Sequence, residues 1–197
     1  MKFCSDCGAP VRQGVPAGDD HERHICDACG TIHYRNPKII AGCIPVWDGK
    51  VLLCRRAIEP RLGYWTLPAG FMELGETLSQ AARREAMEEA NVTVEVEALH
   101  SLFSLPHISQ VYVFFHARMV DERFFPGVES LETRLFAEVE IPWEEISFET
   151  VRRSLRHFFA DRRAGRFVLH AEDIEPVYRA ATPDPSGDLV RAGLSKV

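Results

Sequence analysis

The 197-residue chain contains no apolar run that approaches the roughly 18 residues needed to span a bilayer as a helix. Its first seven residues, Met-Lys-Phe-Cys-Ser-Asp-Cys, lack the apolar core of a signal peptide. Internal repeats and low-complexity runs are also missing. These absences argue against a membrane protein and against a secreted one, so we expect a cytoplasmic protein with no membrane partner.

An excess of positive charge is missing as well, because 23 Lys and Arg residues stand against 29 Asp and Glu residues, a net charge of −6. This balance argues against broad binding to a nucleic acid backbone. An anionic small substrate would need a metal ion or a local basic residue to offset the repulsion. The length supports one full domain with a substantial core and a small appendage.

Cysteine, in contrast, is well represented, and four of the six cysteines form two Cys-x-x-Cys pairs with 18 residues between them. This spacing is typical of a four-cysteine zinc site. Gly8 and Gly30 directly follow the pairs and permit the tight turn of a metal-bound loop. Two disulfides are the alternative, which a reducing compartment disfavours. Cys43 and Cys54 have apolar neighbours and are predicted to be buried. The predicted zinc ligands are Cys4, Cys7, Cys26 and Cys29.

Three regions follow from the composition. Residues 1–36 are too short and polar to form a core alone, so a zinc ion would supply the folding free energy. Asn36-Pro37 marks a boundary, and residues 37–165 form the main domain. Residues 166–197 are a C-terminal extension that we expect to be partly flexible, since Pro-Asp-Pro-Ser-Gly-Asp stands at 183–188.

Hydrophobic periodicity predicts strands and helices in an order typical of an α/β or α+β domain with a mixed sheet. Asp48-Gly49 is a strong hairpin signal between the first two strands. Predicted strands cover residues 38–47, 50–55, 65–67, 92–105, 111–120 and 131–139, and predicted helices cover 77–90 and 148–163.

The first predicted helix carries Glu85, Glu88 and Glu89. At roughly 100° per residue these carboxylates fall within one arc of about 100°. Like charges at such spacings destabilise a helix by about 0.2–0.5 kcal/mol per pair, so a site rather than the fold would explain them. Carboxylates are the hard oxygen ligands that Mg²⁺ or Mn²⁺ prefers. The alternative is a solvated acidic face.

The surroundings of these acids resemble the signature of the Nudix hydrolases: Gly70, five residues, Glu76, seven residues, then Arg-Glu-Ala-Met-Glu-Glu at 84–89. Asn91 stands where the family usually has glycine, and asparagine tolerates a left-handed backbone at a helix end. The resemblance covers about residues 38–165. It implies an α/β/α sandwich with the signature as a loop–helix–loop.

The resemblance also implies an activity, the hydrolysis of a nucleoside diphosphate linked to another moiety. Glu85, Glu88 and Glu89 would then hold Mg²⁺ or Mn²⁺, and Arg84 would orient the catalytic Glu88. Gly70 would let the backbone approach the metal or the substrate phosphate. Glu76 would have a structural or weaker electrostatic role.

Two further residues are candidates outside the signature. By similarity to zinc-ribbon Nudix diphosphatases, Glu129 is the predicted general base, with Glu132 as the alternative, although either could be an exposed acid at a strand edge. Tyr112 could bind substrate by stacking on a base, and so could Phe114, although core packing would explain both.

A four-cysteine ribbon before a Nudix box resembles the NADH diphosphatases. However, Ser-Leu-Pro-His-Ile-Ser-Gln at 104–110 departs from their Ser-Gln-Pro-Trp-Pro-Phe-Pro segment. Residues 106–112 and 129–132 are more similar to bacterial relatives of plant FAD pyrophosphohydrolases. We therefore expect FAD or ADP-ribose as the small-molecule nucleotide substrate, with NADH or NAD-capped RNA as the alternative. The non-enzymatic alternative is a ribbon interaction module with a vestigial Nudix domain. Related diphosphatases suggest a homodimer.

Overall fold

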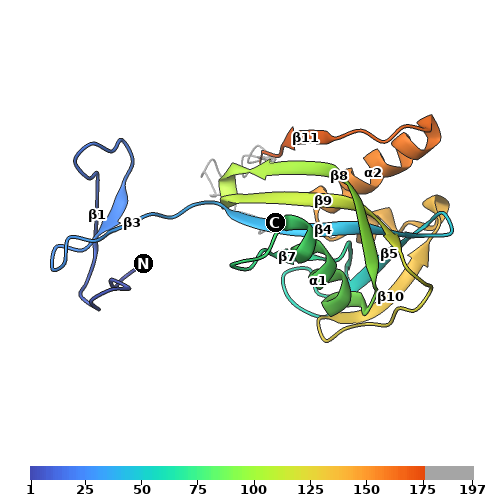
Figure 1. The fold of residues 1–197 in the computed structure, drawn as a ribbon, viewed down its shortest axis with the longest axis horizontal. Helices are drawn as coiled ribbons and strands as arrows, with labels where there is room; N and C mark the ends of the chain where they lie inside the picture. The colour runs from blue at the N-terminus through green and yellow to red at the C-terminus, as the bar shows by residue number, and fades with distance from the viewer. Residues whose placement is uncertain (176–197) are drawn as a thin grey trace, which may run out of the picture. The chain divides into compact units, whose positions relative to one another are not determined.

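The computed structural model describes residues 1–175, which form two compact units, the first ending at Pro37 and the second beginning at Lys38 (Figure 1). The first unit is a three-stranded antiparallel sheet of β1 (Arg12–Gly14), β2 (Arg23–Ile25) and β3 (Ile32–His33). Within residues 1–37 the buried residues are Cys4, Pro16 and Cys26. So small a core agrees with the expectation that a metal ion stabilises this unit.

The second unit is built on an eight-stranded mixed sheet. Its central pair, β4 and β9, is parallel, and so is the pair β8 and β11, whereas the other neighbours are antiparallel. Two short strands lie off the main path, because β6 (Trp65–Thr66) pairs with β5 and β7 (Ala69–Phe71) pairs with β4. The main order is β10 (Ser130–Phe136), β5 (Lys50–Arg56), β4 (Lys38–Trp47), β9 (Gln110–Met119), β8 (Val94–Leu105) and β11 (His170–Asp173).

One helix covers each face of this sheet, α1 (Leu78–Ala90) and α2 (Glu149–Ala164) (Figure 1). The helices pack into two separate cores: alanines of α1 join one, and Val151, Leu155, Phe158 and Phe159 of α2 join the other. The neighbours Cys43 and Ile44 of β4 belong to different cores because successive strand side chains point to opposite faces. This confirms the α/β/α sandwich, and Cys43 and Cys54 are buried as predicted.

Local signals explain the ends of several elements. Asp48 and Gly49 have φ of 44° and 73°, which fits the two-residue turn predicted between β4 and β5. Thr77 caps α1 instead of belonging to it, since its side chain accepts from Gln80 N–H while the Gln80 side chain accepts from Thr77 N–H. Asn91 ends α1 in the left-handed conformation, at φ 48° and ψ 35°, as predicted.

Strand β11 lies inside the 166–197 segment that the sequence assigned to an extension. It pairs in parallel with β8, from His170 opposite Ser101 to Asp173 opposite Ser104. Its four residues, His-Ala-Glu-Asp, carry no apolar alternation, so only pairing with β8 makes them a strand. The predicted strand at 131–139 ends at Phe136, and a 3₁₀ turn occupies Glu138–Glu140. The proline-containing stretch at 183–188 lies outside the described residues. Among residues 1–175, no helix combines the length and apolar character needed to cross a membrane.

Candidate active site and zinc site

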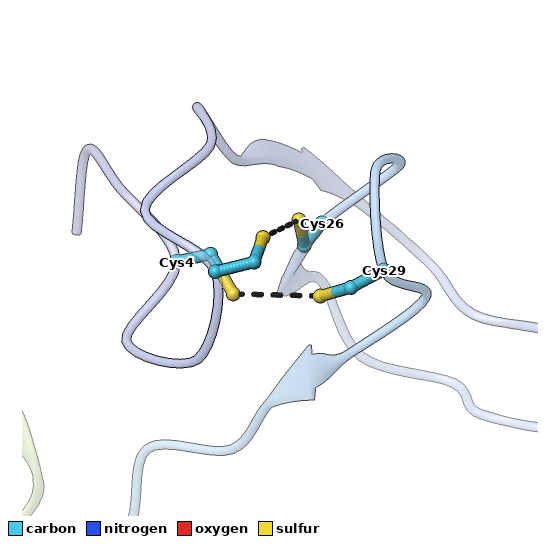
Figure 2. A group of neighbouring side chains, drawn as sticks. Cys4, Cys26 and Cys29 are labelled. Atoms are coloured by element: carbon cyan, nitrogen blue, oxygen red, sulfur yellow. Dashed lines mark hydrogen bonds between the residues drawn. The ribbon is translucent and has the colours of Figure 1, made fainter.

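The four predicted zinc ligands converge in the first unit, with sulfur atoms that all lie within 4.8 Å of one another. Figure 2 shows Cys4, Cys26 and Cys29 turned toward a common point. The Cys4 and Cys29 sulfurs are 3.7 Å apart and those of Cys7 and Cys26 are 3.5 Å apart, far beyond a disulfide bond of about 2.0 Å. Tetrahedral zinc with Zn–S bonds of about 2.3 Å would place sulfurs about 3.8 Å apart. The cluster therefore fits Zn²⁺ and not two disulfides.

The two cysteine loops repeat one backbone pattern. Gly8 N–H donates to Cys4 O at 3.0 Å, and Gly30 N–H donates to Cys26 O at 2.8 Å. Both glycines have φ of 76°, a conformation that side chains rarely adopt, so each Cys-x-x-Cys-Gly loop requires its glycine. His33 Nε2 lies 3.3 Å from Cys4 Sγ, so this histidine touches the cluster from outside the four thiols.

The second unit contains a cavity of about 780 Å³ into which the predicted catalytic helix projects its acids. The residues that line it come from segments far apart in the sequence: the end of β5, β7, helix α1, the β8–β9 connection, β9, and the loop before β10. They include Arg56, Gly70, Phe71, Arg84, Glu85, Glu88, Glu89, Ile108, Gln110, Tyr112, Glu129 and Phe148.

Glu85 and Glu89 lie one helical turn apart and are almost buried, at 8% and 7% exposure. Burial, with a smaller contribution from the Glu85 carboxylate, raises the pKa of Glu89 to about 8, and nearby Arg56 opposes the rise. Burial also raises the pKa of Glu85. Glu89 Oε2 has no hydrogen-bond partner among the described residues. Two nearly buried carboxylates at a cavity, one with an unpartnered oxygen, form a donor set that suits a hard divalent cation such as Mg²⁺ or Mn²⁺.

Arg84 ties these acids to the preceding loop. Its guanidinium forms a two-point contact with Glu76, at 2.7 and 3.1 Å, and donates to Phe71 O at 3.0 Å. The same group donates to Glu85 Oε1 at 2.6 Å and to Glu88 Oε2 at 3.0 Å. The predicted Arg84–Glu88 contact is thus present. Glu76 contacts the site through Arg84, an arrangement compatible with the structural or weaker electrostatic role predicted from the sequence.

Gly70 lies directly under the Glu85 carboxylate. A Cβ atom at this position would come within 2.5 Å of Glu85 Cδ and Oε2, so an added side chain would force the Glu85 carboxylate to move. The glycine therefore leaves room for the Glu85 carboxylate to lie against the backbone of β7. The sequence predicted a close approach to metal or phosphate, whereas the structure shows a close approach to a candidate ligand of the metal.

Glu129 and Glu132 occupy different environments. Glu129 is exposed and lines the cavity with the three helix acids, and its charge contributes to raising the pKa of Glu85 and Glu89. Glu132 does not line the cavity and instead pairs with Arg55 at 3.7 Å. The structure thus places only Glu129 beside the candidate metal ligands.

Arg56 is a residue that the sequence reasoning missed. It ends β5, lines the cavity, and has its Cζ 5.2 Å from the centre of the Phe148 ring, while its Nε donates to Pro60 O at 2.9 Å. The need for a local basic residue near an anionic substrate was the available signal. Nothing in the sequence singled out this arginine, because its place depends on pairing between distant strands.

The aromatic candidates on β9 differ in exposure. Tyr112 pairs with Ile40 across the parallel β4–β9 ladder and is partly buried, which raises the pKa of its hydroxyl. Phe114 is 1% exposed and belongs to the core on the α2 side. Their rings stack at 6.2 Å with an angle of 25°. Both line the cavity, and Tyr112 has more surface available for a ligand.

Comparisons with known proteins agree with this geometry. The NUDIX domain family matches residues 36–162, and the zinc-ribbon family described as Nudix N-terminal matches residues 2–35. A crystal structure of a NUDIX hydrolase from Nitrosomonas europaea is 55% identical, with a TM-score of 0.87, and the match covers 89% of this chain and 99% of that one. An ADP-ribose pyrophosphatase from Streptococcus suis, at 18% identity and a TM-score of 0.53 over 69% of this chain and 99% of that one, shares the fold.

Among curated proteins, the NAD-capped RNA hydrolase NudC of Stutzerimonas stutzeri is 27% identical over 166 residues. That match covers 84% of this chain and 58% of the relative, so the chain spans little more than half of that protein. The Edwardsiella ictaluri protein of the same name is 39% identical over 97 residues, which are 48% of this chain and 35% of the relative. Since the NUDIX domain match covers most of the chain and the signature residues surround one cavity, this protein belongs to the Nudix family and carries the family's N-terminal zinc ribbon.

Proposed function

We propose that this protein hydrolyses the diphosphate linkage of a nucleoside diphosphate derivative with Mg²⁺ or Mn²⁺ as its catalytic metal. The observation that carries the proposal is the meeting of Glu85, Glu88, Glu89 and Glu129 at one cavity, with Glu89 Oε2 buried and unpartnered among the described residues. Because Arg84 and all four carboxylates are in place, the site favours an enzyme over a vestigial domain.

Each residue has a distinct task in this proposal. When bound, the metal neutralises phosphate oxygens and acidifies a water molecule. Glu85, Glu88 and Glu89 hold it, and Arg84 keeps Glu85 and Glu88 in place through its hydrogen bonds. Glu129, exposed at the cavity, accepts a proton from the attacking water.

Arg56 supplies a cation for substrate phosphate oxygens. Among the described residues its guanidinium has no carboxylate within ion-pair distance, unlike Arg84, which pairs with three. An arginine beside a cavity rich in glutamates attracts the part of an anionic substrate that the metal leaves uncompensated. Arg56 would thus be the local basic residue that an anionic substrate needs in a protein with a net charge of −6.

The cavity wall favours an ADP-linked substrate such as FAD or ADP-ribose. A volume of about 780 Å³ lies in the upper part of the roughly 300–1,000 Å³ range of ligand pockets, and Phe71, Tyr112 and Phe148 offer aromatic surface for a base or flavin ring. Ile108 and Gln110 also line it. They belong to the segment at 104–110 that departs from the NADH diphosphatase pattern. The residues that differ from that pattern therefore line the proposed substrate cavity.

A second candidate substrate is NADH or an NAD-capped RNA end. It is favoured by the name of the Stutzerimonas stutzeri relative, whose match covers 84% of this chain. For the ribbon we propose one structural Zn²⁺ and a supporting role or a contact in a homodimer. A cytoplasmic location suits its free thiols.

The test is a substrate panel of FAD, ADP-ribose, NADH and an NAD-capped oligonucleotide, each with Mg²⁺ or Mn²⁺ and with products separated by chromatography. We expect FAD or ADP-ribose to have the highest kcat/KM. Glu88→Gln should lower kcat at least about 100-fold, because the metal loses a ligand. Glu132→Gln is the matched control, since Glu132 lies off the cavity, and it should keep wild-type rates. A clear preference for NADH would select the second candidate, and undiminished turnover by Glu88→Gln would refute the metal assignment.

A further inference from the structure

The loop at residues 124–129, between β9 and β10, lies against the C-terminal end of α1. Phe125 N–H donates to Ala90 O at 3.0 Å, and Gly127 N–H donates to Glu89 O at 2.9 Å. The last carbonyls of a helix have no partner within the helix, so this loop satisfies two of them. The backbone of the catalytic helix and the loop are thus joined directly.

Asn91 adds a third connection to the same loop. Its backbone N–H donates to Ala86 O and Met87 O as the helix cap, while its side-chain Nδ2 donates to Phe125 O at 3.1 Å. A glycine, which the signature usually has here, would supply the left-handed backbone without this side-chain bond. Asparagine in place of the usual glycine therefore adds a side-chain hydrogen bond between the end of α1 and the loop.

Gly127 shows how closely the loop and the helix fit. A Cβ atom there would overlap the Glu88 carbonyl oxygen and lie 2.8 Å from the Glu88 carbonyl carbon. The φ of Gly127 is not positive, so contact rather than backbone strain requires the glycine. The loop backbone thus rests on the backbone of two candidate metal ligands, Glu88 and Glu89.

Two residues beyond this contact stands Glu129. Its carbonyl oxygen accepts from Ala57 N–H at 2.8 Å, and Ser130 N–H donates to Gly127 O at 3.1 Å. The exposed Glu129 is therefore held between the end of α1 on one side and the segment after β5 on the other. Its side chain has no hydrogen bond of its own among the described residues, so the loop backbone sets only the region of the cavity that the carboxylate can reach.

We propose that Asn91 is a positioning residue for Glu129, acting through Phe125 and the loop at residues 124–129. The proposal rests on the proposed function of Glu129 as the proton acceptor. The end of α1 sets the positions of Glu88 and Glu89 directly and, through the Asn91 side chain, the position of the base relative to them. Because misplacement of a reacting group by about 1 Å can cost about 100-fold in rate, a looser loop slows the chemical step more than it weakens binding.

The test uses Asn91→Gly, which keeps the left-handed helix cap and removes only the side-chain bond. We expect kcat to fall about 10-fold and KM to change less than twofold. Amide hydrogen exchange, followed by mass spectrometry, should become faster in residues 124–129. Asp48→Gly is the matched control, because Asp48 is also left-handed, at φ 44°, and lies at the β4–β5 turn away from the cavity. It should leave kcat and exchange of the loop unchanged.

A double-mutant cycle separates positioning from general destabilisation. In a Glu129→Gln background, Asn91→Gly should lower kcat less than twofold further, because there is no carboxylate left to misplace. Independent, multiplicative effects of the two substitutions would overturn the proposal, and so would an unchanged kcat in Asn91→Gly. If the wild-type protein turns over no substrate of the panel, the proposed function itself fails. An active wild type with an unaffected Asn91→Gly refutes only the role of Asn91.

Discussion

Replacing Glu89 by glutamine should stabilise the protein in magnesium-free buffer, by an amount that grows with pH. The pKa of Glu89 is about 8 in the folded protein, against an ordinary value of 4.5, because the carboxyl group is buried beside Glu85. Each pK unit corresponds to about 1.4 kcal/mol. Keeping Glu89 ionised therefore costs the metal-free fold on the order of 5 kcal/mol at high pH.

The sign follows from proton binding. A carboxyl group whose folded pKa is raised holds its proton in the folded state after the unfolded chain has lost it. The free energy of unfolding therefore falls as the pH rises from about 4.5 to about 8. The glutamine side chain of Glu89→Gln carries no charge at any of these pH values, so the variant lacks this part of the pH dependence. The variant should exceed wild type by about 1 kcal/mol or less at pH 5 and by roughly 3 kcal/mol at pH 7.

Urea unfolding at pH 5, 7 and 9, followed by tryptophan fluorescence, measures the difference in zinc-loaded protein free of magnesium. Glu132→Gln, which changes an exposed carboxylate off the cavity, is the matched control for the loss of one negative charge. Adding Mg²⁺ should reverse the order, because the metal binds ionised Glu89 and stabilises only the folded wild type. A stability difference that does not change between pH 5 and 9 would refute the burial argument.

Three other substitutions test separate parts of the structure. Gly70→Ala should lower kcat about 10- to 100-fold in steady-state assays, since its methyl group displaces the Glu85 carboxylate, and wild-type kcat would contradict this contact. Cys26→Ser should reduce zinc, measured by elemental analysis, from one equivalent per chain to a small fraction, and full occupancy would exclude the four-thiol site. Burial lowers the pKa of His100 to about 4, so unfolding free energy should fall as the pH drops from about 6.5 to 4, by at most about 3 kcal/mol. His100→Gln should lose that part in denaturant titrations, and an identical pH dependence in both proteins would contradict it.

Features that depend on near neighbours in the chain were predictable. The turn at Asp48 and Gly49 and the left-handed Asn91 follow from local backbone preferences. The Arg84–Glu88 contact follows from helical spacing. Such features need no knowledge of the rest of the chain, because the interacting groups are at most a few residues apart.

Features that depend on strand pairing were not predictable in the same way. Arg56 reaches the cavity because β5 ends there, and β11 is a strand only because β8 offers it a partner. The sequence suggested that Gly70 approaches metal or phosphate, whereas in the structure it lies against the Glu85 carboxylate. In each case the contacting residue lies many positions away in the sequence. The pattern of apolar and polar residues does not predict such a contact.

By itself the sequence determined the two-part organisation, the four-cysteine cluster, the order of most strands and helices, and the helix that carries the acids. It could do so because residue spacing along a loop or a helix fixes which side chains face the same way. Only the tertiary structure decided that Glu129 rather than Glu132 lies at the cavity, that Arg56 lines it, and that the Asn91 side chain connects helix to loop. Those outcomes depend on the register of strands and on backbone contacts between segments far apart in the chain, which hydrophobic periodicity does not specify.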